Sequence, residues 1–116
     1  LIGMGCLMKR IALLTLTLLV AATVSMRAAD VTDNWKKNCA ACHGNDGKGK
    51  TKAGRKAKVK DLTDAEYQKT FTDEKAAHQI KDGMKVDDKE VMKAYGDKLS
   101  ADEIKDLVAL IRKFKS

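Results

Sequence analysis

The sequence has no proline, little aromatic content and few cysteines. Of its 116 residues, 34% are charged but only 4% are aromatic, and there are three cysteines, two histidines and one tryptophan. The length suits one domain and excludes a large multidomain enzyme. Because aromatic side chains contribute much of the area that a core buries, their scarcity leaves a thin apolar core. Such chains often need a disulfide, a metal or a cofactor, so we expect something besides side chains to complete the core.

The sequence also lacks internal repeats and strand-like alternation of apolar and polar residues. That absence excludes a parallel sheet, and with it a nucleotide-binding α/β fold. Apolar periodicity instead predicts four helices, at about residues 31–39, 63–71, 72–82 and 100–114. The last has the strongest signal, since Ser100 opens a capping box and is followed by one apolar stripe, formed by Ile104, Leu107, Val108, Ile111 and Phe114.

Two further helix starts and two long connections follow from the same patterns. Thr63 stands three residues before a glutamate, which is capping-box spacing, and Thr72 or the next residue opens the following helix. Gly83 is placed to end that helix. Residues 48–60 and 84–99 are predicted as loops, because they show no helical stripe.

The first 29 residues differ in composition from the rest. They hold three basic and no acidic residues, and residues 11–24 are apolar apart from three threonines. A short basic region, an apolar run and then small residues are the layout of a secretory signal peptide. Fourteen helical residues span about 21 Å, short of a bilayer core of roughly 30 Å, so a transmembrane helix is the weaker interpretation. We expect residues 1–29 to be a signal peptide, cleaved at 25–29, and residues 30–116 to be an exported domain.

One short motif carries chemistry. Cys39-Ala40-Ala41-Cys42-His43 is a C-x-x-C-H sequence, the attachment pattern for c-type haem. Two thiols at this spacing near the end of a helix can each bond a vinyl group of the haem as a thioether. The following histidine is then placed to bind the iron. We therefore expect Cys39 and Cys42 to hold one covalent haem c and His43 to ligate its iron.

Three other interpretations of the motif are weaker. A structural zinc site needs four ligands, and beyond Cys39, Cys42 and His43 only the distant His78 remains. A thioredoxin-like redox pair expects a βαβ setting, which the sequence does not show. A disulfide in an oxidising compartment would leave both the following histidine and the thin core unexplained.

The motif and its surroundings resemble the small bacterial class I monohaem c-type cytochromes. The resemblance covers nearly all of residues 31–115 and implies an all-α cytochrome c fold, with three to five helices and long loops around one haem. It also implies His43 as the proximal ligand, Met92 as the distal ligand, and crossing first and last helices. The matching segments are the haem motif with its glycine turn, Trp35, Asp61-Leu62-Thr63, Ile80-Lys81-Asp82-Gly83 and Met92 to Ser100.

Two positions depart from that family. It usually has proline after the ligand methionine and before the Asp-Leu pair, where this chain has Lys93 and Lys60. Proline would stiffen the methionine loop. We therefore predict that Met92 is held less firmly and is displaced more readily, for instance by a lysine at alkaline pH. The Lys60 backbone carbonyl could still accept a hydrogen bond from His43 Nδ1.

Other side chains compete with Met92 as the distal ligand. Met84 directly follows the helix-ending Gly83 and would need a different loop path, and His78 lies in the middle of a predicted helix. Any methionine also has an ordinary use as a core gap-filler. Met92 is favoured by its context, because a Tyr-Gly pair and then the Ser100 cap follow it closely.

An iron with both axial positions filled by protein has no place for a substrate, so we expect a periplasmic electron carrier rather than an enzyme. The alternatives are a haem-based small-ligand sensor or peroxidase-like protein with an open iron position, or an electron-entry subunit of a larger oxidoreductase. Carbon monoxide binding to the reduced protein separates an open from a filled position.

The charge distribution bears on partners. Of the net charge of +7, residues 1–29 carry +3 and residues 30–116 carry +4. Residues 48–60 hold seven basic and no acidic side chains. Such a run suits a hydrated loop, or a patch that steers the protein to acidic surfaces on redox partners. Nucleic acid is not an expected partner, because export and the lack of stacking aromatics argue against it. We expect a monomer that meets membranes only through partners or an uncleaved leader.

Overall fold

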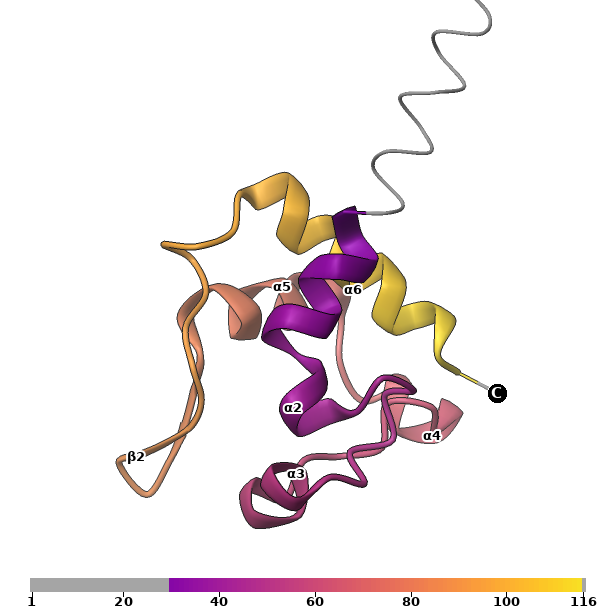
Figure 1. Ribbon diagram of the computed structural model, residues 1–116, viewed down its shortest axis with the longest axis vertical. Helices are drawn as coiled ribbons and strands as arrows, with labels where there is room; N and C mark the ends of the chain where they lie inside the picture. Colours follow the sequence, from indigo (N-terminus) through magenta and orange to yellow (C-terminus); the bar gives the residue numbers. More distant parts are fainter. Residues whose placement is uncertain (1–29, 116) are drawn as a thin grey trace, which may run out of the picture. The chain divides into compact units, whose positions relative to one another are not determined.

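The computed structural model describes residues 30–115, so the predicted signal peptide and its cleavage region lie outside the described residues. The described part is rich in helix and contains one two-stranded antiparallel sheet (Figure 1). This architecture confirms the predicted all-α class. The elements are helical residues 30–38, α2 (Ala40–His43), α3 (Lys52–Ala57), α4 (Ala65–Gln68), α5 (Asp73–Asp82), β1 (Met84–Val86), β2 (Lys89–Met92) and α6 (Ala101–Lys113).

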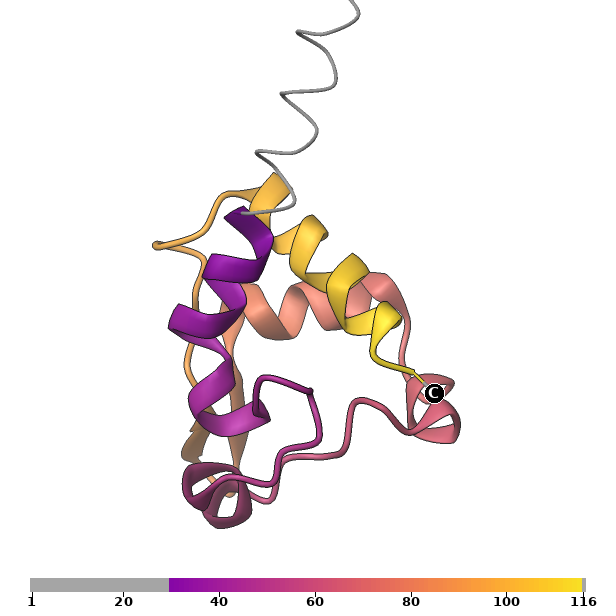
Figure 2. The ribbon, with the colours of Figure 1, turned by 45° about the vertical axis from the view of Figure 1, so that its right-hand side comes forward.

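The core lies where the amino-terminal helix, α5 and α6 meet (Figure 2). The predicted stripe on α6 is confirmed, since four of its members are buried and Phe114 packs against them. Asn34 Nδ2 donates to Glu103 Oε2 at 2.8 Å and so joins the first helix to α6. Within residues 30–115, nine apolar residues are buried: Trp35, Leu62, Ala76, Ile80, Leu99, Ile104, Leu107, Val108 and Ile111.

Two of the predicted helix starts are confirmed and one is wrong. Ser100 forms the capping box of α6, and the Thr72 side chain accepts from the Lys75 amide at the start of α5. Helix α4, however, is capped by Asp64, whose carboxylate accepts from the Glu66 and Tyr67 amides. The Thr63 hydroxyl instead donates to Asp61 Oδ1 at 2.6 Å. The neighbouring carboxylate therefore takes the capping position that the spacing assigned to Thr63.

The prediction that residues 48–60 form a loop is wrong in its middle, where the chain forms α3. Thr51 caps this helix by accepting from the Gly54 amide at 2.9 Å, and Lys58 ends it in a left-handed conformation, with φ 55°. Gly54 is the only buried residue of α3. A helix that buries no apolar stripe has no periodicity for a sequence pattern to reveal. This helix also raises the number of helices above the expected three to five.

The prediction that residues 84–99 form a loop is wrong at their start, where β1 and β2 form a hairpin. Met84 pairs with Met92, and the turn residues Asp87 and Asp88 both have positive φ, at 52° and 62°. A two-residue turn of this kind usually carries Asn-Gly, so the acidic pair conceals the hairpin from a sequence pattern. The strands are also too short, and too exposed, to show alternation.

A buried polar group joins the end of α6 to the connection between α4 and α5. Gln68 is only 4% exposed, and its Nε2 donates to the Leu62 and Ile111 carbonyls at 2.8 and 2.7 Å. The Arg112 guanidinium donates in turn to the Gln68 and Phe71 carbonyls and pairs with Asp73. These bonds join the end of α4 and the start of α5 to the end of α6, which no sheet connects.

Replacing Gln68 tests this junction. Gln68→Ala leaves the buried Leu62 carbonyl without a donor and removes one of two donors to the Ile111 carbonyl, which still accepts from the Phe114 amide. We therefore expect the free energy of unfolding to fall by about 1–3 kcal/mol. Gln79→Ala is the matched control, because Gln79 donates only to the exposed Met84 sulfur, and it should cost less than about 0.5 kcal/mol. Guanidinium unfolding of the holoprotein measures both. Equal effects would show that Gln68 does not hold the junction.

Candidate functional site

The C-x-x-C-H motif occupies a helical turn that follows a break in the first helix. Cys39 separates helical residues 30–38 from α2. The Cys42 amide donates to the Cys39 carbonyl at 3.3 Å, and the His43 amide donates to the same carbonyl at 2.9 Å. Gly44 ends the turn with a φ of 79°, which favours glycine. The two thiols and the imidazole therefore lie on one short, bounded segment.

Both cysteines of the motif are free thiols and are half-buried. Burial, and secondarily the neighbouring Cys42, raises the pKa of Cys39 to about 11. The thiol of Cys39 is therefore protonated at neutral pH. Cys39 and Cys42 therefore do not form a disulfide in this structure.

His43 carries the clearest sign of a missing partner. Its Nδ1 atom is buried and has no hydrogen-bond partner among residues 30–115. The suggested bond to the Lys60 carbonyl is therefore wrong for this structure. Burial lowers the pKa of His43, so that its imidazole is neutral at pH 7 and able to bind a metal. Nδ1 is the nitrogen that such a bond would orient, so Nε2 remains as the nitrogen that could bind iron.

Trp35 holds the end of the motif in place. Its indole Nε1 donates to the Gly44 carbonyl at 3.0 Å, and its ring centroid lies 5.8 Å from that of His43. On its other side the indole packs on Phe114, with the ring centroids 4.9 Å apart. The histidine is thus positioned through Trp35 by both the first helix and the end of α6.

Helix α3 packs directly on the motif, which the sequence did not predict. The Thr51 hydroxyl lies 2.8 Å from the Ala41 carbonyl and 3.0 Å from the Cys42 carbonyl, and hydrogen-bonds to both. Gly54 approaches so closely that any side chain there would collide with the Cys42 carbonyl. The signal that the sequence offered for this helix was Thr51, because threonine often caps the start of a helix by accepting from the amide three residues later. The basic segment is therefore anchored beside the cysteines.

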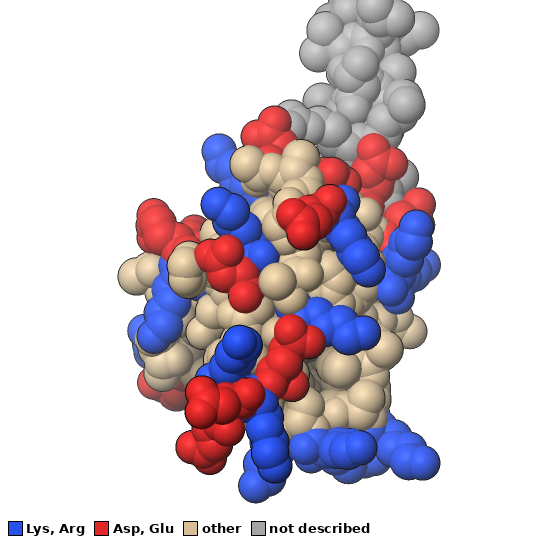
Figure 3. All heavy atoms as spheres, turned by 90° about the vertical axis from the view of Figure 1, so that its left-hand side faces the viewer, with Lys and Arg blue, Asp and Glu red and all other residues tan. Residues whose placement is uncertain are grey.

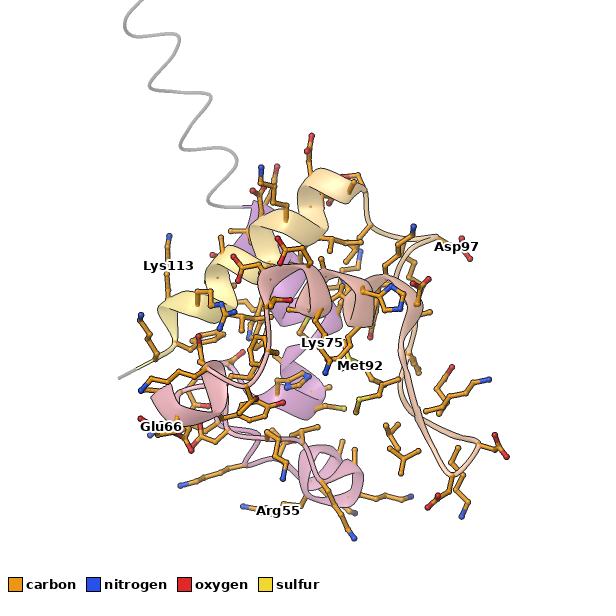
Figure 4. The ribbon with its side chains drawn as sticks, turned by 180° about the vertical axis from the view of Figure 1, so that it is seen from behind. Arg55, Glu66, Lys75, Met92, Asp97 and Lys113 are labelled. Atoms are coloured by element: carbon orange, nitrogen blue, oxygen red, sulfur yellow. The ribbon has the colours of Figure 1, made fainter. Side chains whose placement is uncertain are left out.

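Met92 lies at the end of β2, half-buried and packed against the core. Figure 4 shows its side chain on the inner side of the hairpin, towards the body of the protein. Its strand partner Met84 is 40% exposed and accepts a contact from Gln79. His78 pairs with Asp82 on an exposed part of α5. Of the candidate distal ligands, Met92 is therefore the one directed inward.

The described residues contain neither a membrane-spanning helix nor a cluster of metal-binding side chains. No helix within residues 30–115 is long and apolar enough to cross a bilayer. Nor does any group of three or more His, Cys, Asp and Glu side chains in this part of the chain form a metal site. The zinc alternative therefore has no support in the described residues.

Comparison with known proteins agrees with the motif. The model of the family described as "Cytochrome C oxidase, cbb3-type, subunit III" matches residues 27–111. Among curated proteins no sequence matches the chain.

Two solved structures are similar to this chain. The KustC0563 c-type cytochrome is 33% identical and superposes with a TM-score of 0.66, over 73% of this chain and 96% of that one. A tyrosine-to-phenylalanine mutant of Kustc0563 is 34% identical, with a TM-score of 0.65, over 74% of this chain and 99% of that one. The chain therefore belongs to the c-type cytochromes, with a covalently bound haem c and its iron as cofactor and electron transfer as the chemistry that this cofactor supports.

Proposed function

We propose that this chain is a periplasmic electron carrier whose haem is bound by Cys39 and Cys42 and ligated by His43 and Met92. The single observation that carries the proposal is the short, bounded turn that holds two free thiols and the neutral imidazole of His43 together. Residues 1–29 are proposed as its signal peptide and residues 30–116 as a monomeric carrier domain.

The residues of the site have distinct tasks in this proposal. When bound, the haem supplies an iron centre that accepts and releases one electron. Burial keeps His43 neutral, and Trp35 restrains the turn that carries it. Met92 offers a soft thioether, and His/Met ligation favours ferrous iron. With both axial positions filled, the site has no coordination position for a substrate, which suits a carrier rather than an enzyme.

A second candidate function follows from the matched family. Its description names a subunit of an oxidase, so this domain could serve as the electron-entry subunit of a larger oxidoreductase. Purification of the native protein distinguishes the two functions. Isolation as a free monomer supports the carrier, whereas stable association with a larger redox complex supports the subunit.

The proposed docking surface is the basic segment around α3. Figure 3 shows a row of basic side chains along the lower edge of the molecule, where α3 lies. Because Thr51 and Gly54 fasten this segment to the motif, its positive charge lies close to the haem-bearing turn. We propose that it steers the carrier to an acidic surface on a redox partner. The surface consists of Lys48, Lys50, Lys52, Arg55, Lys56, Lys58 and Lys60.

The ligand assignment is tested by Met92→Ala. We expect this variant to lose the sulfur-to-iron charge-transfer absorption of the oxidised protein and to bind carbon monoxide rapidly when reduced. Met84→Ala, which alters the strand partner, should keep the absorption and resist carbon monoxide. Retention of the band in Met92→Ala would refute Met92 as the ligand. Rapid carbon monoxide binding by the unaltered protein would favour the sensor or peroxidase alternative.

The docking surface is tested with a small anionic oxidant, ferricyanide. Oxidation of the reduced protein should slow as salt is added, because screening weakens attraction to the α3 surface. The triple variant Lys52→Gln/Arg55→Gln/Lys56→Gln should react several-fold more slowly at low salt. Lys105→Gln/Lys113→Gln/Lys115→Gln removes the same charge elsewhere and should change the rate less. Equal effects of the two triple variants would assign the attraction to net charge alone.

The dependence of the fold on the haem is tested by Cys39→Ser/Cys42→Ser. Without covalent haem, we expect this variant to be largely unstructured, because cofactor binding and folding are coupled. Circular dichroism and thermal unfolding measure the loss against the unaltered holoprotein. A helical apoprotein that unfolds cooperatively would show that side chains alone suffice for the fold.

A further inference from the structure

The helix break at Cys39 leaves a backbone carbonyl that another part of the chain satisfies. In an unbroken helix the Cys42 amide would donate to the Asn38 carbonyl, four residues earlier. Here that amide donates to the Cys39 carbonyl instead. The Tyr95 hydroxyl, 57 residues away in the sequence, donates to the Asn38 carbonyl at 2.8 Å. The Tyr95 side chain thus caps the helix end immediately before Cys39, the first of the two haem-bonding cysteines.

The backbone of Tyr95 is fixed from the opposite side by α5. Its amide donates to the Ile80 carbonyl at 2.9 Å, and the next amide, of Gly96, donates to the Lys81 carbonyl at 3.0 Å. The Tyr95 carbonyl accepts from the amides of Lys98 and Leu99. Both its amide and its carbonyl are therefore engaged, so the backbone from which the ring projects is held in place.

Met92 belongs to the same restrained segment. Gly83, at the end of α5, lies against the Met92 carbonyl and the Ala94 amide, so closely that a side chain there would collide with both. Only Lys93 and Ala94 lie between Met92 and Tyr95, and neither is a proline that would stiffen the connection. A shift of Tyr95 would therefore be passed on to Met92 through this short connection.

We propose that Tyr95 is a positioning residue, whose hydroxyl holds the Met92 segment (residues 92–99) against the haem-attachment turn at residues 38–43. This inference rests on the proposed ligation by His43 and Met92, because the ligation gives the restraint its functional consequence. In this chain the hydrogen bond would replace the stiffening that proline gives the methionine loop in the family. It fixes the distance between the two segments that carry the proposed iron ligands, His43 and Met92.

The inference is tested with Tyr95→Phe in the oxidised holoprotein, using imidazole as the competing ligand. This substitution keeps the half-buried ring and removes only the hydroxyl. One lost hydrogen bond is worth a factor of about five to ten, so imidazole should displace the methionine at a concentration lower by that factor. The displacement is followed by loss of the sulfur-to-iron absorption.

The chain offers a matched control in its only other tyrosine. Tyr67 packs on Phe71, with the ring centroids 5.5 Å apart, and is not part of the contact with Asn38. Tyr67→Phe should leave the imidazole affinity within about twofold of the unaltered protein, which is the usual range for substitutions outside such contacts. An unchanged imidazole affinity in Tyr95→Phe, or an equal increase in both variants, would overturn the proposal.

Amide hydrogen exchange separates this inference from the ligand assignment. Tyr95→Phe should raise exchange in both residues 38–43 and residues 92–99, whereas Tyr67→Phe should not. If the unaltered protein lacks the sulfur-to-iron absorption, the proposed ligation fails, and exchange alone then decides whether Tyr95 joins the two segments. Unchanged exchange in both segments would refute the restraint, whatever ligates the iron.

Discussion

Attachment of the covalent haem is the constraint that we expect this fold to depend on, because the elements that carry the attachment motif and Met92 bury almost nothing among themselves. The buried apolar side chains come from the first helix, α5, α6 and the segments that join them. Helix α2 and strands β1 and β2 have no buried residue, and α3 has only Gly54. The part of the domain that carries the cysteines and Met92 therefore has no apolar core of its own. The proposed haem, held by Cys39 and Cys42 and ligated by His43 and Met92, would tie these elements together where side-chain burial does not.

Side-chain hydrogen bonds to backbone carbonyls join the segments of this domain, as the backbone hydrogen bonds of a sheet do in other small domains. Trp35 donates to Gly44, Thr51 donates to Cys42, and Tyr95 donates to Asn38. All three acceptors lie in or beside the haem-attachment turn, where the helix break and its glycine end leave carbonyls without helical partners. Each bond brings a different segment to that turn. The turn is consequently held from three directions even though few apolar contacts surround it.

The distribution of charge connects this architecture to electron transfer. The basic residues around α3 have little apolar area to bury, so their segment can remain at the surface while Thr51 and Gly54 fasten it to the turn. A cluster of seven positive charges is thereby kept close to the cysteines. Under the proposed function, an anionic partner drawn to this surface would arrive near the haem-attachment turn.

The sequence by itself determined the features that depend on local spacing. The cysteine pair with its histidine, the cap at Ser100 and the stripe ending at Phe114 each lie within a few turns of helix, so their spacing alone reveals them. The resemblance added Met92, and the structure places it half-buried, on the inward side of its hairpin.

Only the tertiary structure decided the features that depend on distant partners. Helix α3 and the hairpin escaped prediction because they bury no apolar stripe, and Asp64 took the cap expected of Thr63. His43 lost its suggested bond to Lys60, and Asn38 gained one from Tyr95. The physical reason is that a backbone carbonyl left open by a helix break has no sequence signature. Its donor is whichever side chain the fold brings within reach.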